Sequence, residues 1–140
     1  MISIMKEKFL RTCDHIGIIT NNYRKLVSFY TEKLEFTVEK EEKLSKFVMR
    51  SVFGLASEGK FTRLVSGNAG IEIFCITSNL LKKKVNATIG YNHWALRVED
   101  KNEFVRKIMK KGVIIIHIKR NDHSVYFIKD PDGNRIEIKD

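Results

Sequence analysis

Four residues of the types that bind metal ions lie in similar surroundings along this sequence: His15, Glu72, His93 and Glu137. Each lies in a short segment whose neighbouring positions carry the apolar residues expected of a strand. Side chains alternate between the two faces of a strand, so each candidate ligand points away from the face that its apolar neighbours cover. Four such strands, two from each half of the chain, would direct two imidazoles and two carboxylates at one point.

Two imidazoles and two carboxylates suit a borderline or hard divalent ion, namely Zn²⁺, Ni²⁺, Co²⁺, Mn²⁺ or Fe²⁺. Open positions on such an ion accept water or two neighbouring oxygen atoms of a substrate. A bound ion makes the carbon next to a chelated carbonyl a stronger acid, and a carboxylate ligand can act as the base. Taken singly, each residue also fits an exposed or hydrogen-bonded position on a strand. A metal-free binding protein that kept these residue types is therefore an alternative.

The apolar pattern around these residues predicts two similar halves, each made of a strand, a helix and three strands. The pair Asp14-His15 of the first half aligns with Asn92-His93 of the second. A helix is expected at residues 23–34, and a second one runs from a cap at Asp100 to Gly112. Strands are expected at residues 12–19, 36–42, 61–65, 71–77, 91–98, 113–119, 124–129 and 134–139, with a further one over 44–55.

The length and composition fit one domain of 140 residues. Within it we expect a first module at residues 11–77, a linker at 78–90 and a second module at 91–140. Hydrophobic residues make up 43% of the chain, which is enough for a sizeable core, and no apolar run is long enough to cross a bilayer. Residues 1–10 lack the apolar core of a signal peptide, and two cysteines are too few for a disulfide framework. We therefore expect a cytoplasmic protein.

The net charge of +9 raises the question of a nucleic-acid partner. The lysines are scattered, however, and the only dense run is Lys82-Lys83-Lys84. No helix-turn-helix, zinc-finger or RNA-binding sheet motif accompanies them. We expect neither nucleic acid nor membrane as a partner, and two interpretations of the charge stay open: a solvated surface, or attraction of an anionic small substrate.

Four segments, at residues 14–18, 28–36, 92–98 and 127–138, together resemble the vicinal oxygen chelate superfamily. This superfamily includes glyoxalase I, methylmalonyl-CoA epimerase, extradiol dioxygenases, fosfomycin-resistance proteins and bleomycin-binding proteins. The phrase Asp-Pro-Asp-Gly-Asn followed by a glutamate is specific in combination with the other segments. The resemblance implies an α+β fold in which two βαβββ modules form a curved, cupped mixed sheet around a metal site. It also implies a homodimer by analogy, with the cup closed either within one chain or between two chains.

The resemblance further implies what the four candidate ligands do. Glyoxalase-I-like members use a histidine or glutamine and a glutamate from each half, and this sequence keeps the full set of His15, Glu72, His93 and Glu137. By the same analogy either Glu137 or Glu72 is the catalytic base. The implied function is a metal-dependent lyase or isomerase that transfers a proton next to a carbonyl of a small substrate.

Two other functions of the same superfamily remain as alternatives. Dioxygenases and thiol transferases that act on antibiotics usually use three ligands, so the fourth, Glu72, argues against them. Bleomycin-binding members have lost the metal and only sequester a drug. Arg97 lies four residues after His93 and therefore on the same face, where it is a candidate for binding an anionic substrate group. A plain surface position for Arg97 is the competing interpretation.

Overall fold

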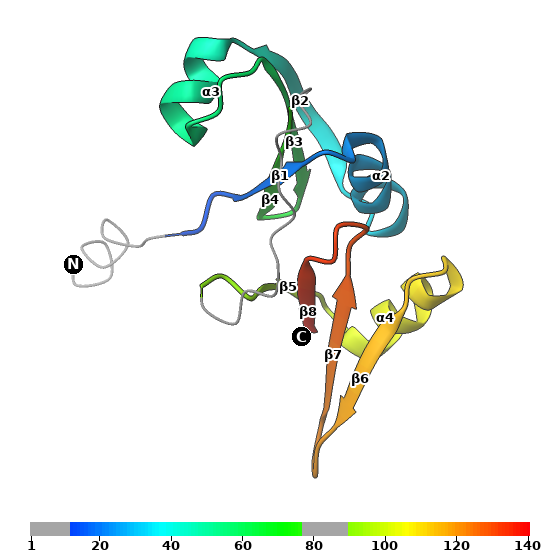
Figure 1. Cartoon of the computed structure of the whole chain (residues 1–140). Coiled ribbons are helices and arrows are strands. Elements are labelled where there is room, and N and C mark those ends of the chain that lie inside the picture. The colour runs from blue at the N-terminus through cyan, green and yellow to red at the C-terminus, as the bar shows by residue number, and fades with distance from the viewer. Residues whose placement is uncertain (1–11, 77–89) are drawn as a thin grey trace, which may run out of the picture.

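The computed structural model describes residues 12–76 and 90–140. The segment at residues 1–10, the basic run at residues 82–84 and the expected linker apart from Gly90 lie outside the described residues. The described part forms two modules, coloured blue to green and yellow-green to red in Figure 1. None of its helices is both long enough and apolar enough to cross a bilayer.

The first module begins with a strand and a helix and continues with three strands, the first two joined through a further helix. Its elements are β1 (Ile16–Thr20), α2 (Tyr23–Ser28), the π-helical segment η1 (Phe29–Lys33), β2 (Thr37–Leu44), α3 (Lys46–Phe53), β3 (Gly59–Ser66) and β4 (Ala69–Ile76). The second module has one helix, and its elements are β5 (His93–Arg97), α4 (Lys101–Lys110), β6 (Ile115–Lys119), β7 (Ser124–Lys129) and β8 (Arg135–Lys139).

Each module forms its own four-stranded mixed sheet, with the order β1-β4-β3-β2 in the first and β5-β8-β7-β6 in the second. The first strand of each module pairs in parallel with the last, β1 with β4 and β5 with β8, and the other pairs are antiparallel. This confirms the expected α+β fold of two βαβββ-like modules. It also places the histidine strand beside the glutamate strand in both modules.

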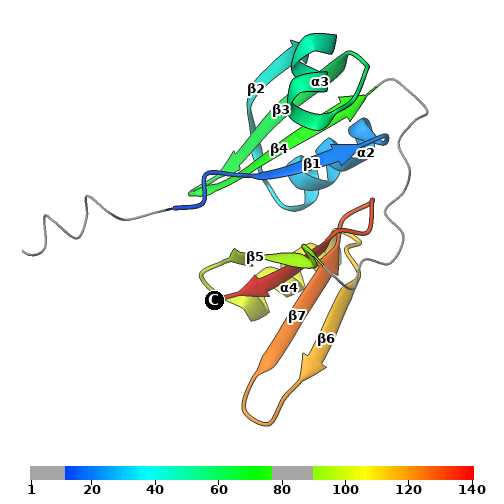
Figure 2. The ribbon, with the colours of Figure 1, turned by 60° about the vertical axis from the view of Figure 1, so that its left-hand side comes forward.

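A helix covers one face of each sheet, and the apolar residues of the strands point toward it. α2 packs on the first sheet and α4 on the second, as Figures 1 and 2 show. Trp94 packs against this core, as its position in the alternating pattern predicts. The buried strand residues of the core are Ile18, Leu64, Ile71, Ile73, Leu96, Ile128, Ile136 and Ile138.

Residues of η1 and the turn after it hold the two modules together. The hydroxyl of Tyr30 donates to Oδ2 of Asp130 at 2.8 Å, and both residues are buried. Burial raises the pKa of both groups. Glu35 forms ion pairs with Lys107 and Lys111 at the edge of the same interface, with Nζ–Oε distances of 2.8 and 3.1 Å. The modules therefore meet on their helix sides.

The strand expected over residues 44–55 is wrong, because this segment contains helix α3. The side chain of Ser45 accepts a hydrogen bond from the backbone N–H of Val48, which caps the helix, and Gly54 ends it with φ of 69°. Met49 and Phe53 are four residues apart, so they lie on one face of a helix. The apolar content alone did not distinguish this spacing from that of a strand.

Candidate metal centre

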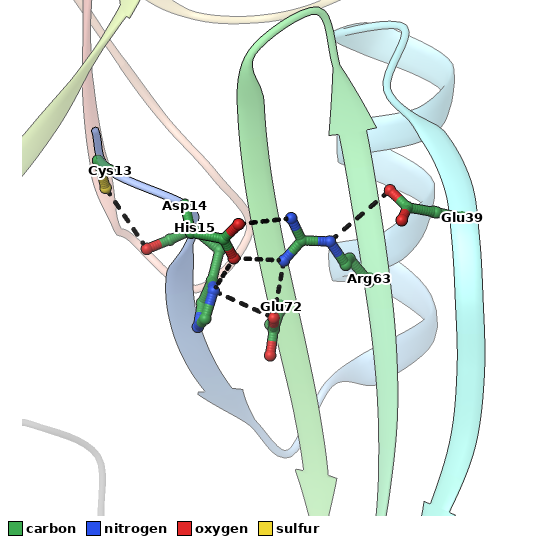
Figure 3. Close-up of polar contacts among 6 residues, drawn as sticks. All are labelled: Cys13, Asp14, His15, Glu39, Arg63 and Glu72. Carbon is green, nitrogen blue, oxygen red and sulfur yellow. Dashed lines mark hydrogen bonds and ion pairs between the residues drawn. The ribbon is translucent and has the colours of Figure 1, made fainter. Parts of the chain in front are cut away.

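His15, the residue just before β1, lies beside Glu72 in the middle of β4. Nδ1 of His15 is 3.1 Å from Oε2 of Glu72, and the side chains are 39% and 16% exposed. Asp14 joins them, so that one ligand-type atom from each of the three residues lies within 4.8 Å of the others (Figure 3). This group comes from the parallel pairing of β1 with β4, which brings residues more than fifty positions apart onto one face.

Gly70 makes the close approach of the Asp14-His15 segment to β4 possible. A Cβ atom at Gly70 would lie 2.5 Å from the backbone oxygen of Asp14 and 3.4 Å from Cβ of His15. The first distance is shorter than real Cβ contacts allow, and the atom it meets is backbone, which has no rotamer to change. A glycine is therefore required here for the histidine to reach the glutamate.

His93 and Glu137 form the corresponding pair in the second module, in which the other ring nitrogen of the histidine faces the glutamate. Nε2 of His93, at the start of β5, is 3.5 Å from Oε2 of Glu137 on β8. The ring of Phe127 meets the His93 ring edge-on, with centroids 5.1 Å apart. The side chains of His93 and Glu137 are 37% and 22% exposed, so this pair is open to solvent to a similar degree as the first.

The structure thus brings the four predicted ligands together as two pairs, one in each module. Among residues 12–76 and 90–140, Asp14, His15 and Glu72 are the one group of three or more such residues that meets within 4.8 Å. His93 and Glu137 stay outside that group. The two sheets are separate (Figure 2), and each carries one histidine–glutamate pair.

The residue before each histidine, Asp14 or Asn92, forms a hydrogen bond with Nδ1 of that histidine. The sequence alone did not predict this role. Nδ1 of His15 lies 2.7 Å from Oδ2 of Asp14, and Nδ1 of His93 lies 2.8 Å from Oδ1 of Asn92. Both partners are oxygen acceptors, so Nδ1 carries the proton in each contact and Nε2 carries the free electron pair in the neutral ring. The repeated position of the two residues in both halves was a signal that could have revealed this role.

Arg63 is a third residue near the candidate ligands whose role the sequence did not reveal. Its Nη1 atom donates to Oε2 of Glu72 at 2.9 Å and to Oδ2 of Asp14 at 3.0 Å, and its Nε lies 3.6 Å from Glu39 (Figure 3). The hydrogen bonds from His15 and then Arg63 lower the pKa of Asp14, and the bond to Asp14 contributes most to a raised pKa of Arg63. The register Arg63↔Glu72 in the β3–β4 pair explains the contact, and it is not visible in the sequence.

Arg97 lies on β5 and is exposed, and its Nη1 donates to the main-chain oxygen of Asp140 at 2.8 Å. The position expected for an anion-binding arginine is therefore tied to the end of the second sheet. Its role with a substrate stays a prediction.

The donor set suits a divalent ion. An imidazole and two carboxylates in reach of one another, with partial exposure, are the ligands that zinc, manganese and iron accept. Asp14, Glu39 and Glu72 surround the single guanidinium of Arg63, so the cluster carries excess negative charge on a chain that is positive as a whole. This local charge favours binding of a cation.

Comparisons with known proteins agree on the fold. The family model described as Glyoxalase/Bleomycin resistance protein/Dioxygenase superfamily matches residues 12–138. A glyoxalase family protein from Enterococcus faecalis is 23% identical, with a TM-score of 0.72 over 94% of this chain and 99% of that chain. The trypanothione-dependent glyoxalase I of Leishmania major is also 23% identical, with a TM-score of 0.69 over 94% of this chain and 87% of that one.

TnmS3, an antibiotic binding protein from Streptomyces sp. CB03234, is 13% identical, with a TM-score of 0.64 over 94% of this chain and 96% of that one. At these identities the structural likeness concerns the fold alone. No curated protein matches the sequence significantly.

Proposed function

Because the chain belongs to the glyoxalase/bleomycin resistance protein/dioxygenase superfamily, we propose that it is a metal-dependent lyase or isomerase that transfers a proton next to a carbonyl of a small substrate. The observation that carries the proposal is the repeated pairing of a histidine with a glutamate. His15 lies 3.1 Å from Glu72 in the first module, and His93 lies 3.5 Å from Glu137 in the second. A protein that only sequesters a drug has no need of two such pairs on the same face of two sheets.

A complete site requires a second copy of the chain. The helix-side contact between Tyr30 and Asp130 joins the two modules of one chain and leaves the histidine–glutamate pairs of both sheets partly exposed. On the second sheet, Phe127 pairs with Ile116 on one neighbouring strand and with Glu137 on the other, so all three side chains lie on the face that carries the ligands. Ile116 is 40% exposed there. A homodimer in which the first module of one copy meets the second module of the other would cover these faces.

In this dimer His15 and Glu72 of one copy and His93 and Glu137 of the other would hold a divalent ion. A bound ion supplies a Lewis acid that polarises the substrate carbonyl and stabilises the negative charge left when the proton departs. Arg63 donates to Glu72 and holds that carboxylate in place. Glu137 has no such clamp among the described contacts, so it is the carboxylate that moves to take up and return the proton.

Two singly substituted chains test the composite site. Glu72→Gln and Glu137→Gln should each bind metal and lose most activity in a hemithioacetal screen with several thiols. When the two inactive proteins are unfolded and refolded together, half of the dimers are mixed, and each mixed dimer contains one intact site. Activity should therefore return to about a quarter of the wild-type value.

Two results would contradict this proposal. Full activity in either single variant removes that carboxylate from the proposed mechanism, and no recovery on mixing means that each site lies within one chain. Metal analysis of the purified wild-type protein separates the enzyme from a metal-free binding protein. Oxygen uptake with catechols separates a lyase from a dioxygenase.

A further inference from the structure

Helix α3 lies on the same face of the first sheet as the candidate ligands. A Cβ at Gly59 would lie 2.7 Å from Sδ of Met49, so the helix packs directly over β3. Met49 and Phe61 are buried but do not belong to the main core, which lies on the helix side of the sheet. They form a second, smaller apolar cluster with Phe53 and Phe74. The ring centroids of Phe53 and Phe74 are 4.8 Å apart, and those of Phe61 and Phe74 are 5.2 Å apart.

This aromatic cluster adjoins the candidate metal centre. Phe74 follows Glu72 by two residues on β4, so both side chains point to the same face about 7 Å apart along the strand. Phe61 pairs with Phe74 in the register in which Arg63 pairs with Glu72. On this face of the sheet, the charged pair of β3 and β4 is therefore followed directly by an aromatic pair, two residues further along each strand.

Gly17 leaves the Phe74 ring uncovered on the side of β1. Gly17 is the register partner of Glu72, and a Cβ there would lie 3.8 Å from the Phe74 ring, an ordinary contact. Its φ is not among the positive values of the described glycines, so neither backbone conformation nor close packing requires a glycine here. The next residue on this face, Ile19, pairs with Phe74 and is 40% exposed. The missing side chain thus opens an apolar platform beside the ligands.

We infer that the substrate carries a flat apolar or aromatic group that packs on Phe74 and Ile19 across Gly17, while its two neighbouring oxygens face the ion held by His15 and Glu72. This inference rests on the proposed function and adds the class of substrate. Aromatic rings gain from edge-to-face and offset contacts, and covering Phe74 and Ile19 removes apolar surface from water. A substrate with only a small or charged group at this position would leave that surface exposed.

Two hydroxamates test the inference, because they chelate through the same pair of oxygens and differ in one group. Acetohydroxamate carries a methyl group and benzohydroxamate a phenyl ring. Titration of the cobalt-loaded protein, followed by its visible spectrum, gives both dissociation constants. Benzohydroxamate should bind about tenfold tighter than acetohydroxamate, after correction for their affinities for free cobalt.

Three variants locate the preference. Phe74→Ala removes the platform and Gly17→Leu covers it, so each should reduce the preference for benzohydroxamate to about twofold or less. Phe47→Ala is the matched control, since Phe47 lies on α3 but is 79% exposed, and it should leave both constants unchanged. Gly17→Leu also keeps the test valid where Phe74→Ala fails to fold.

Equal corrected affinities of the wild-type protein for the two hydroxamates would overturn the inference and leave the metal proposal intact. A preference that persists in both Phe74→Ala and Gly17→Leu would also overturn it. Failure of the protein to bind cobalt at all would instead overturn the proposed function, and the inference with it.

Discussion

Nη1 of Arg63 donates to Oε2 of Glu72 at 2.9 Å across the β3–β4 pair, so a guanidinium shares the carboxylate proposed to bind the ion. Replacing Arg63 by Met removes a positive charge beside Asp14 and Glu72. We expect the Arg63→Met protein to bind Zn²⁺ severalfold more tightly, because the attraction between the cation and the carboxylates increases. Competition with a chromophoric chelator measures this affinity, and Arg63→Lys, which keeps the charge, should stay close to wild type.

The Arg63→Met protein should also gain more thermal stability from zinc than the wild type does, since tighter binding to the folded state stabilises it further. Weaker zinc binding by Arg63→Met would contradict the prediction. It would mean that the orientation of Glu72 by Arg63 outweighs the repulsion between Arg63 and the ion.

Asp14 orients His15 in the way that Asn92 orients His93, through an oxygen on Nδ1. Asp14→Ala removes the acceptor and should lower zinc affinity about tenfold. Asp14→Asn restores the acceptor found naturally in the second module and should stay within about threefold of wild type. Competition with the chromophoric chelator measures the zinc affinity of both variants. An equal loss of affinity in both would show that Asp14 acts through its charge or as a ligand.

Because Gly70 has no side chain, the backbone oxygen of Asp14 can lie where a Cβ atom at position 70 would be only 2.5 Å away from it. Gly70→Ala should destabilise the protein by about 1–3 kcal/mol, because the start of β1 must move away. It should also weaken zinc binding, since His15 moves with that segment. Gly17→Ala is the control, as its Cβ finds an ordinary 3.8 Å contact. Similar unfolding midpoints in urea for the two variants would disprove the close-approach argument.

The buried contact between Tyr30 and Asp130 should make the junction of the modules sensitive to pH. Burial raises the pKa of Asp130 above its ordinary value of 3.8. The folded state therefore binds this proton more tightly than the unfolded state, and the Asp130 contribution to stability rises as pH falls through the folded pKa toward 3.8. Above the folded pKa the ionised carboxylate depends on its donors, among them Tyr30.

Tyr30→Phe removes that donor and should cost about 1–2 kcal/mol near neutral pH. The cost should be smaller at acidic pH, because burial raises the pKa of Asp130 and the carboxyl group, once protonated, depends less on a donor. Urea unfolding of both proteins at the two pH values measures the difference. Tyr91→Phe serves as control, because Tyr91 is 99% exposed, and its effect should be negligible at either pH. A pH-independent loss for Tyr30→Phe would rule out the coupling to Asp130.

Local sequence was sufficient for the fold class and for the choice of His15, Glu72, His93 and Glu137 as candidate ligands. Alternation of apolar and polar residues is a property of neighbouring positions, and it placed His15, Glu72, His93 and Glu137 on strand faces opposite the core. The duplicated order of a strand, a helix and three strands, together with the resemblance to the superfamily, then predicted the fold. The α3 segment was mistaken for a strand, because its apolar residues fit either period until the capping contacts of Ser45 and Gly54 are known.

Tertiary structure decided what surrounds those ligands. The contact of Arg63 with Glu72 depends on the register of β3 against β4, and the aromatic group at Phe74 depends on α3 folding back over the sheet. The division into two pairs depends on how the modules pack through Tyr30 and Asp130. These are contacts between residues distant in the chain. They are selected by packing and by the pairing of buried polar groups over the whole domain, and no local pattern encodes them.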